Sequence, residues 1–117
     1  MTMKGAFIDL WLELTQHRDP KVRRRAVASA CSCHLKANHQ QIWDRLLAMT
    51  EDPDSSVRSH VLHNLVDGSP SVRRDEVVAR LERMQHDADP HLRRRVRRLV
   101  AYYRRTGTVN AGKAMGL

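Results

Sequence analysis

Aromatic residues are scarce in this 117-residue chain, and long apolar runs are missing. With two tryptophans, two tyrosines and one phenylalanine, any core must be mainly aliphatic. No apolar stretch approaches the roughly 18 residues that a membrane-spanning helix needs, so we predict no membrane span. The N-terminal stretch MTMKGAFIDLWLEL also lacks a small-residue cleavage site, and we do not expect a secretory signal.

Cysteine is rare as well. Cys31 and Cys33 lie two positions apart in a segment with a helical pattern, so they point to different sides and do not readily form a disulfide. For the same reason the cluster that ends at His34 cannot converge on one metal ion. His60 and His63 share a helix face, but no third ligand is obviously placed beside them. We predict no metal, no cofactor and a reduced, cytoplasmic protein.

Catalytic motifs are also missing from the sequence. It contains no glycine-rich loop that would hold a phosphate, no nucleophile elbow and no pair of acids on a common face. We therefore nominate no catalytic residue and predict that the chain is not an enzyme.

Positive charge is plentiful. The formal net charge is +8 and the isoelectric point is near 10.5, which favours anionic partners such as nucleic acid, acidic protein surfaces or anionic lipid. Most of the 21 basic residues are arginines, whose forked guanidinium favours bidentate contacts. A genome of biased base composition would produce the same preference, so arginine content alone does not identify a partner.

Similar residues recur every 35 positions in three segments, with no insertion. The apolar columns are Phe7, Ile42 and Val77; Trp11, Leu46 and Leu81; Leu14, Met49 and Met84; Val22, Val57 and Leu92; Ala26, Val61 and Val96; and Ala30, Leu65 and Val100. Within each half of a unit the apolar positions follow the spacing of one helix face. We predict a single domain over 1–106, with two-helix repeats at about 5–36, 38–68 and 71–106.

A turn that contains Asp-Pro separates the two helices of each unit, at Asp19-Pro20, Asp52-Pro53 and Asp89-Pro90. Aspartate accepts hydrogen bonds from the free amides at a helix start, and proline fits the first helical position. In the second unit Asp-Pro lies two residues earlier and Ser55 replaces the proline. This departure leaves the geometry of the second turn open.

The second helices begin with DPKVRRRAVASA (19–30), DSSVRSHVLHNL (54–65) and DPHLRRRVRRLV (89–100). These segments match the Asp-Pro-x-Val-Arg-x-x-Ala pattern of the HEAT-repeat family, which the chain resembles over about residues 6–106. The resemblance implies an all-α fold: an α-solenoid of three antiparallel helix pairs, of the HEAT/armadillo-like kind, with the second helices lining its concave side.

Two groups of arginines are expected to be structural. Arg23, Arg58 and Arg93 each follow an aspartate by four residues, the helical spacing for an ion pair. The family resemblance implies that this column links adjacent repeats. Arg97 and Arg104 lie on the flank of the last helix where a fourth repeat would otherwise stack, and a capping helix needs a polar outer face there.

The other basic residues of the second helices point away from the core when 100° is counted per residue. Across the repeats they fall in three columns without acids, and one tyrosine lies about a turn beyond. We predict that they form a basic stripe of partner-binding residues: Arg24, Arg25, His60, His63, Arg94, Arg95, Arg98 and Tyr102. A solvated face of an arginine-rich helix would show the same pattern.

We predict a non-enzymatic interaction or scaffold module that binds an acidic protein or peptide segment in a basic concave groove. The alternative is nucleic-acid binding through the same stripe, and catalysis on damaged nucleic acid or a small anion is a third hypothesis. Few lysines and few aromatics favour protein over nucleic acid. We expect a monomer or an edge-to-edge homodimer. Residues 107–117 are expected to form a mobile tail, and the alternative is that Val109, Met115 and Leu117 dock on the last helix or on another molecule.

Overall fold

All regular secondary structure in the described part of the chain is helical. The computed structural model describes residues 3–30, 39–112 and 115–116. The α-helices are α1 (Met3–Leu14), α2 (Pro20–Ser29), α4 (Gln40–Ala48), α5 (Ser55–Leu65), α6 (Arg74–Met84) and α7 (Pro90–Thr106), and the short 3-10 helices are η1 (Met49–Glu51) and η2 (Ser71–Arg73). The predicted all-α class is confirmed. None of these helices combines the length and the apolar composition needed to cross a lipid bilayer.

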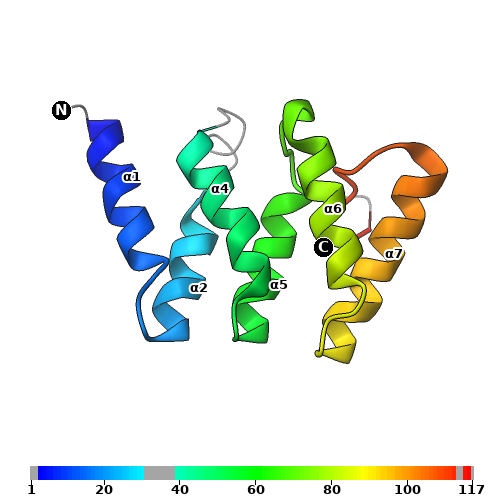
Figure 1. The fold of residues 1–117 in the computed structure, drawn as a ribbon, viewed down its shortest axis with the longest axis horizontal. Coiled ribbons are helices and arrows are strands. Elements are labelled where there is room, and N and C mark those ends of the chain that lie inside the picture. The colour runs from blue at the N-terminus through cyan, green and yellow to red at the C-terminus, as the bar shows by residue number, and fades with distance from the viewer. Residues whose placement is uncertain (1–2, 31–38, 113–114, 117) are drawn as a thin grey trace.

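The helices form three antiparallel pairs that follow one another along the longest dimension of the molecule (Figure 1). α1 pairs with α2, α4 with α5 and α6 with α7, within an envelope of 45 × 28 × 22 Å. Contacts between pairs run from α2 to α5 and from α1 to α4, so both helices of the first repeat pack on their equivalents in the second, and from α4 to α6, so the first helices of the second and third repeats pack together. The predicted helical repeat is confirmed.

Aspartate caps the second helix of each pair. The carboxylates of Asp19 and Asp89 accept hydrogen bonds from backbone N–H groups of the first helical turn, and a proline follows each of them. Asp54 caps α5 in the same way although Ser55 follows it in place of proline. The displaced Asp-Pro of the second repeat therefore leaves the start of its second helix unchanged.

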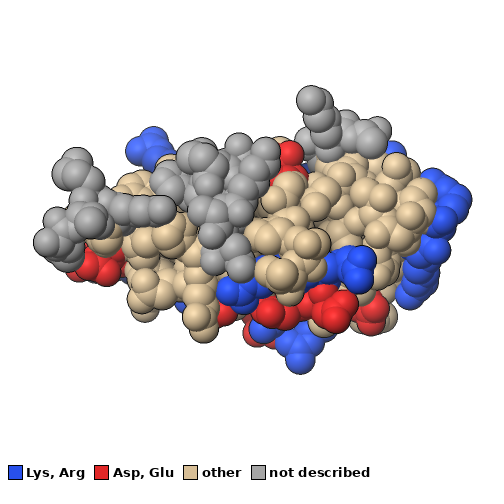
Figure 2. Space-filling model, turned by 90° about the horizontal axis from the view of Figure 1, so that it is seen from above, with Lys and Arg blue, Asp and Glu red and all other residues tan. Residues whose placement is uncertain are grey.

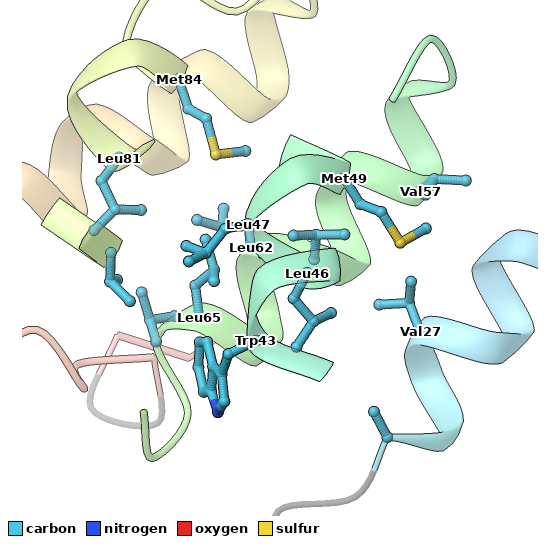
Figure 3. Close-up of a cluster of buried hydrophobic side chains, with 14 of the residues drawn as sticks. Val27, Trp43, Leu46, Leu47, Met49, Val57, Leu62, Leu65, Leu81 and Met84 are labelled. Atoms are coloured by element: carbon cyan, nitrogen blue, oxygen red, sulfur yellow. The ribbon is translucent and has the colours of Figure 1, made fainter. Parts of the chain in front are cut away.

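The core is a continuous cluster of mainly aliphatic side chains between the first and second helices. In the middle repeat Leu46, Leu62 and Leu65 are fully buried (Figure 3). In the first repeat the indole N–H of Trp11 donates to the carbonyl oxygen of Ala26 at 2.7 Å, which satisfies its polar edge inside the core. Because a helix pair buries its apolar face only against neighbours, the middle pair is the most completely enclosed.

Residues 107–112, the first part of the expected tail, contact the helical domain. Gly107 ends α7 with a φ of 75°, a left-handed conformation that glycine adopts without strain. The side-chain oxygen of Asn110 then accepts hydrogen bonds from the backbone N–H groups of Gly68 at 2.9 Å and Ser69 at 2.7 Å. Val109 is buried beside it. The segment contacts the α5–α6 connection because one asparagine satisfies two backbone donors there.

Candidate interaction surface

The predicted basic stripe lies on the second helices α2, α5 and α7, and all of its residues are outside the core. Its exposed members are Arg25, His60, His63, Arg94 and Arg98. Its half-buried members are Arg24, Arg95 and Tyr102. The seven arginines and histidines thus lie outside the core, whereas Tyr102 packs against it.

Two arginines of the stripe reach α5 from the helices on either side of it. Arg24 Nη1, from α2, lies 3.4 Å from the hydroxyl oxygen of Ser56, and Arg95 Nη1, from α7, donates to the hydroxyl of Ser59 at 2.8 Å. The two serines are three residues apart on α5, on one helix face. The short serine side chains leave room for longer side chains from both neighbours, a role that sequence reasoning missed. Side chains from α2 and from α7 thus both reach the N-terminal half of α5.

The histidines of the stripe have different surroundings. His60 lies beside the serines, with Nδ1 2.8 Å from the carbonyl oxygen of Ser56. His63 lies one turn further on, with Nε2 3.6 Å from the carboxylate of Asp67. Asp67 occupies the repeat position of Tyr102, which lies outside the three acid-free columns of the stripe. Asp67 thus places one acid just after the C-terminal end of α5, and Asp54, which accepts a hydrogen bond from the Ser56 hydroxyl, places another at the N-terminal end.

Tyr102 is a poorer stacking platform than the sequence suggested. Its ring is half-buried, and the guanidinium carbon of Arg105 lies 5.3 Å from the ring centre, within the range of a cation–π contact. An incoming base or aromatic side chain would have to compete with that arginine. Tyr102 therefore contributes the edge of the surface.

Several basic residues of η2 and α6 lie close to acids, whereas the stripe arginines of the second helices do not. Arg73 Nη1 lies 3.4 Å from Asp44 and 3.2 Å from Glu76, and Arg83 Nη1 lies 3.6 Å from Glu51. Within the described ranges, no carboxylate lies within ion-pair distance of the stripe arginines Arg24, Arg25, Arg94, Arg95 and Arg98.

The first two members of the aspartate–arginine column form a ladder between repeats. Arg23 Nε and Nη2 lie 2.9 and 3.0 Å from the two carboxylate oxygens of Asp52, and Arg58 binds Asp87 with both distances 2.8 Å. Hydrogen bonding to the partner carboxylate raises the pKa of Arg23 and of Arg58. Each partner lies in the turn of the next repeat, rather than four residues earlier on the same helix. The column links adjacent repeats, as the resemblance implied.

Basic side chains also collect at the end of the molecule that α7 forms. Figure 2 shows them as a blue band at that end, whereas acidic and basic side chains lie together along the adjoining edge. The exposed arginines of α7 are Arg94, Arg97, Arg98, Arg104 and Arg105. Arg97 and Arg104 are solvent-facing, as expected for a polar outer flank.

Two hollows in the structure lie away from the stripe. One lies between the α5–α6 connection and residues 107–110, and the other is lined by Thr50, Glu51, Arg83, Met84 and Asp87. Neither of these two hollows includes a predicted binding residue. The cluster from Cys31 to His34 lies outside the described residues.

A family model described as HEAT repeats matches residues 8–101, which contain four of the six described α-helices in full and most of α1 and α7. No curated protein and no solved structure gave a match. HEAT repeats generally mediate protein interactions as scaffolds and are typically non-enzymatic. With four-fifths of its length matched by this model and three helix pairs at the expected interval, the chain belongs to the HEAT-repeat family.

Proposed function

We propose that this chain is a non-enzymatic interaction module that binds an acidic segment of another protein on the second-helix surface. The observation that carries the proposal is the convergence of Arg24 and Arg95 over the two serines of α5. Three helices thereby contribute to one basic patch, with Arg25 and His60 exposed on the same helices.

The chemistry of the patch suits carboxylates. A guanidinium presents several N–H donors in one plane and forms two parallel hydrogen bonds with a carboxylate, which are stronger than bonds between neutral groups. The Ser59 hydroxyl, which accepts a hydrogen bond from Arg95, can donate to a second oxygen of the same ligand. An extended acidic peptide lying across α2, α5 and α7 would meet these donors in succession.

Nucleic acid is the competing ligand, because phosphates also attract this charge. The Tyr102 ring is the aromatic of the patch, and Arg105 lies over it. Without an open aromatic platform, single-stranded bases gain little stacking energy. This observation favours an acidic protein segment.

The test is binding of a fluorescent peptide of alternating Asp and Glu, followed by fluorescence anisotropy. Arg25→Glu combined with Arg95→Glu should weaken binding about tenfold or more, since each arginine supplies charge-assisted bonds. The matched control is Arg18→Glu combined with Arg74→Glu, which makes the same change in net charge outside the second helices. Circular dichroism should show unchanged helicity in both double variants.

The outcomes are distinct. Equal loss in the two double variants would mean that net charge alone attracts the peptide, and the proposed surface would be wrong. Duplex and single-stranded DNA are titrated in parallel over a salt series. Tighter binding of DNA, with affinity that falls steeply with salt and is lost only in the Arg25/Arg95 variant, would replace the protein ligand by nucleic acid.

A further inference from the structure

Each internal arginine of the ladder makes the same two contacts. Its Nη1 first donates to the carbonyl oxygen six residues earlier, at 2.8 Å from His17 for Arg23 and 2.8 Å from Asp52 for Arg58. Its Nε and Nη2 then bind both carboxylate oxygens of an aspartate in the following turn. The first contact holds the guanidinium in place, and the second joins the repeats.

Arg93, the third member of the column, makes the first contact without the second. Its Nη1 donates to the carbonyl oxygen of Asp87 at 2.8 Å, as in the two earlier repeats. No carboxylate in the described part of the chain lies within ion-pair distance of it. The described segment that follows α7 contacts the α5–α6 connection instead of supplying an aspartate here. Arg93 is half-buried. It occupies the same repeat position as Arg23 and Arg58, which each bind a carboxylate.

The partners inside the ladder define the shape of the ligand that Arg93 would recognise. Asp52 and Asp87 each bind the arginine and also accept a hydrogen bond from the backbone N–H two residues later, both at 2.9 Å. The aspartate is therefore fixed in a tight turn that precedes a helix. Both turns read Asp-x-Asp in the sequence, because the second aspartate caps that helix.

Around Arg93, the end of the stack is charged where the interior is apolar. Val27 and Leu62 are fully buried in the first two repeats, and the equivalent residue of the third is the exposed Arg97. Leu47 is buried, and its equivalent is the exposed Glu82. An ordinary apolar repeat would bury these charges at a high cost, so the ligand must be acidic near Arg97.

We propose that Arg93, flanked by Arg94 and Arg97, binds an aspartate in an acidic Asp-x-Asp turn of another protein. A second copy of this chain is a poor occupant. If a second copy stacked on α7 as one repeat stacks on the next, its His17 would lie opposite Arg93 and its Lys21 opposite Arg94. His17 occupies the repeat position of Asp52, which binds Arg23, and Lys21 that of Ser56, which lies beside Arg24. Neither pair provides a carboxylate.

The test uses the full chain and the Nε–H signals of its arginines in ¹⁵N NMR spectra. The probe is the acetylated hexapeptide amide Glu-Asp-Pro-Asp-Ser-Ser, which copies the sequence of the turn at residues 51–56. We expect the Arg93 Nε–H signal to move downfield and saturate at millimolar peptide, a range suited to a ligand with one anchoring residue. The signals of Arg23 and Arg58, which already bind aspartates, should stay fixed.

Two controls decide the outcome. The peptide with both aspartates replaced by asparagine should leave the Arg93 signal in place. Arg93→Lys should weaken binding at least about fivefold, since lysine lacks the fork, whereas Arg104→Lys should not. No shift at Arg93, or equal shifts at Arg94, Arg97 and Arg104, would overturn the proposal. The Arg25/Arg95 variant keeps Arg93, so failure here and failure of the second-helix surface are separate results.

Discussion

Asp54 shows at the scale of one residue how a short side chain starts a helix. Its carboxylate accepts hydrogen bonds from the hydroxyl of Ser56 and from the backbone N–H groups of Ser56 and Val57. These bonds, the Ser56 hydroxyl foremost, hold the pKa of Asp54 below its usual value. The pKa of Asp89 is lowered in the same way, chiefly by the N–H of Leu92.

Acid should therefore remove the caps of α5 and α7. Since the folded-state pKa lies below the unfolded value, the stabilisation is complete above about pH 4 and is lost as the pH falls through the folded-state pKa. Asp54→Ala should lower the melting temperature at pH 7, and its difference from the parent chain should shrink toward pH 2 to 3. Thermal scans by circular dichroism test this, with Asp9→Ala as a control at an exposed, non-capping carboxylate. A difference that stays constant with pH would contradict the assignment.

At the scale of the element, ion pairs of the ladder link the turn of one repeat to the second helix of the repeat before it. The side chains of Arg58 and Asp87 are only 12% and 6% exposed, and the pair makes two parallel hydrogen bonds at 2.8 Å. The same guanidinium also donates to the carbonyl oxygen of Asp52. One arginine thus fixes the turn before its own helix and the turn after it.

Removing one partner of this ladder should destabilise the fold. Asp87→Ala leaves a mostly buried guanidinium without its carboxylate, and we expect a loss of about 2 to 4 kcal/mol in the free energy of unfolding. Glu82→Ala removes an exposed acid from the same repeat and should change stability by less than about 0.5 kcal/mol. Urea unfolding of the three proteins compares them. Similar effects for the two substitutions would show that the ladder contributes little.

Helix pairs were predictable because they depend on local spacing. The apolar columns, the caps at Asp19 and Asp89 and the helix end at Gly107 all follow from residues close together in the sequence. The ladder partners were not predictable in the same way. Arg23 is four residues from Asp19 and 29 residues from Asp52. Helical spacing points to Asp19 as its partner, and nothing in the local sequence points to Asp52.

The candidate interaction surface was predictable only as a side of each helix. Exposure of the stripe follows from helical geometry, but the contacts of Arg95 with Ser59 and of Arg105 with the ring of Tyr102 depend on how side chains reach across packed helices. The anchoring of residues 107–112 depends on Asn110, whose partners lie more than forty residues earlier. Composition carries no signal of such pairing.

At the scale of the whole molecule, the two ends of the stack differ in chemistry. Arg45 reaches back to the preceding repeat, with Nη2 2.9 Å from the carbonyl oxygen of Thr15. In the first repeat its position is taken by Leu10, which is 54% exposed. At the other end, Arg97 takes the position of the buried Leu62. One end is therefore partly apolar, and the other is charged.

Arg97 should keep the α7 end from associating with other copies. Arg97→Leu restores the apolar column of Val27 and Leu62 at an exposed position, and buried leucine gains roughly 2 kcal/mol over exposed leucine. We expect this variant to form concentration-dependent dimers in sedimentation-velocity experiments, through contact of the new apolar end with a second copy. Arg98→Leu makes the same change in charge and hydrophobicity one residue further along α7, outside that column, and should sediment like the parent chain. If the two variants behave alike, Arg97 does not prevent association of copies at this end. The part that Arg97 plays beside Arg93 in the proposed aspartate site would then lose this support.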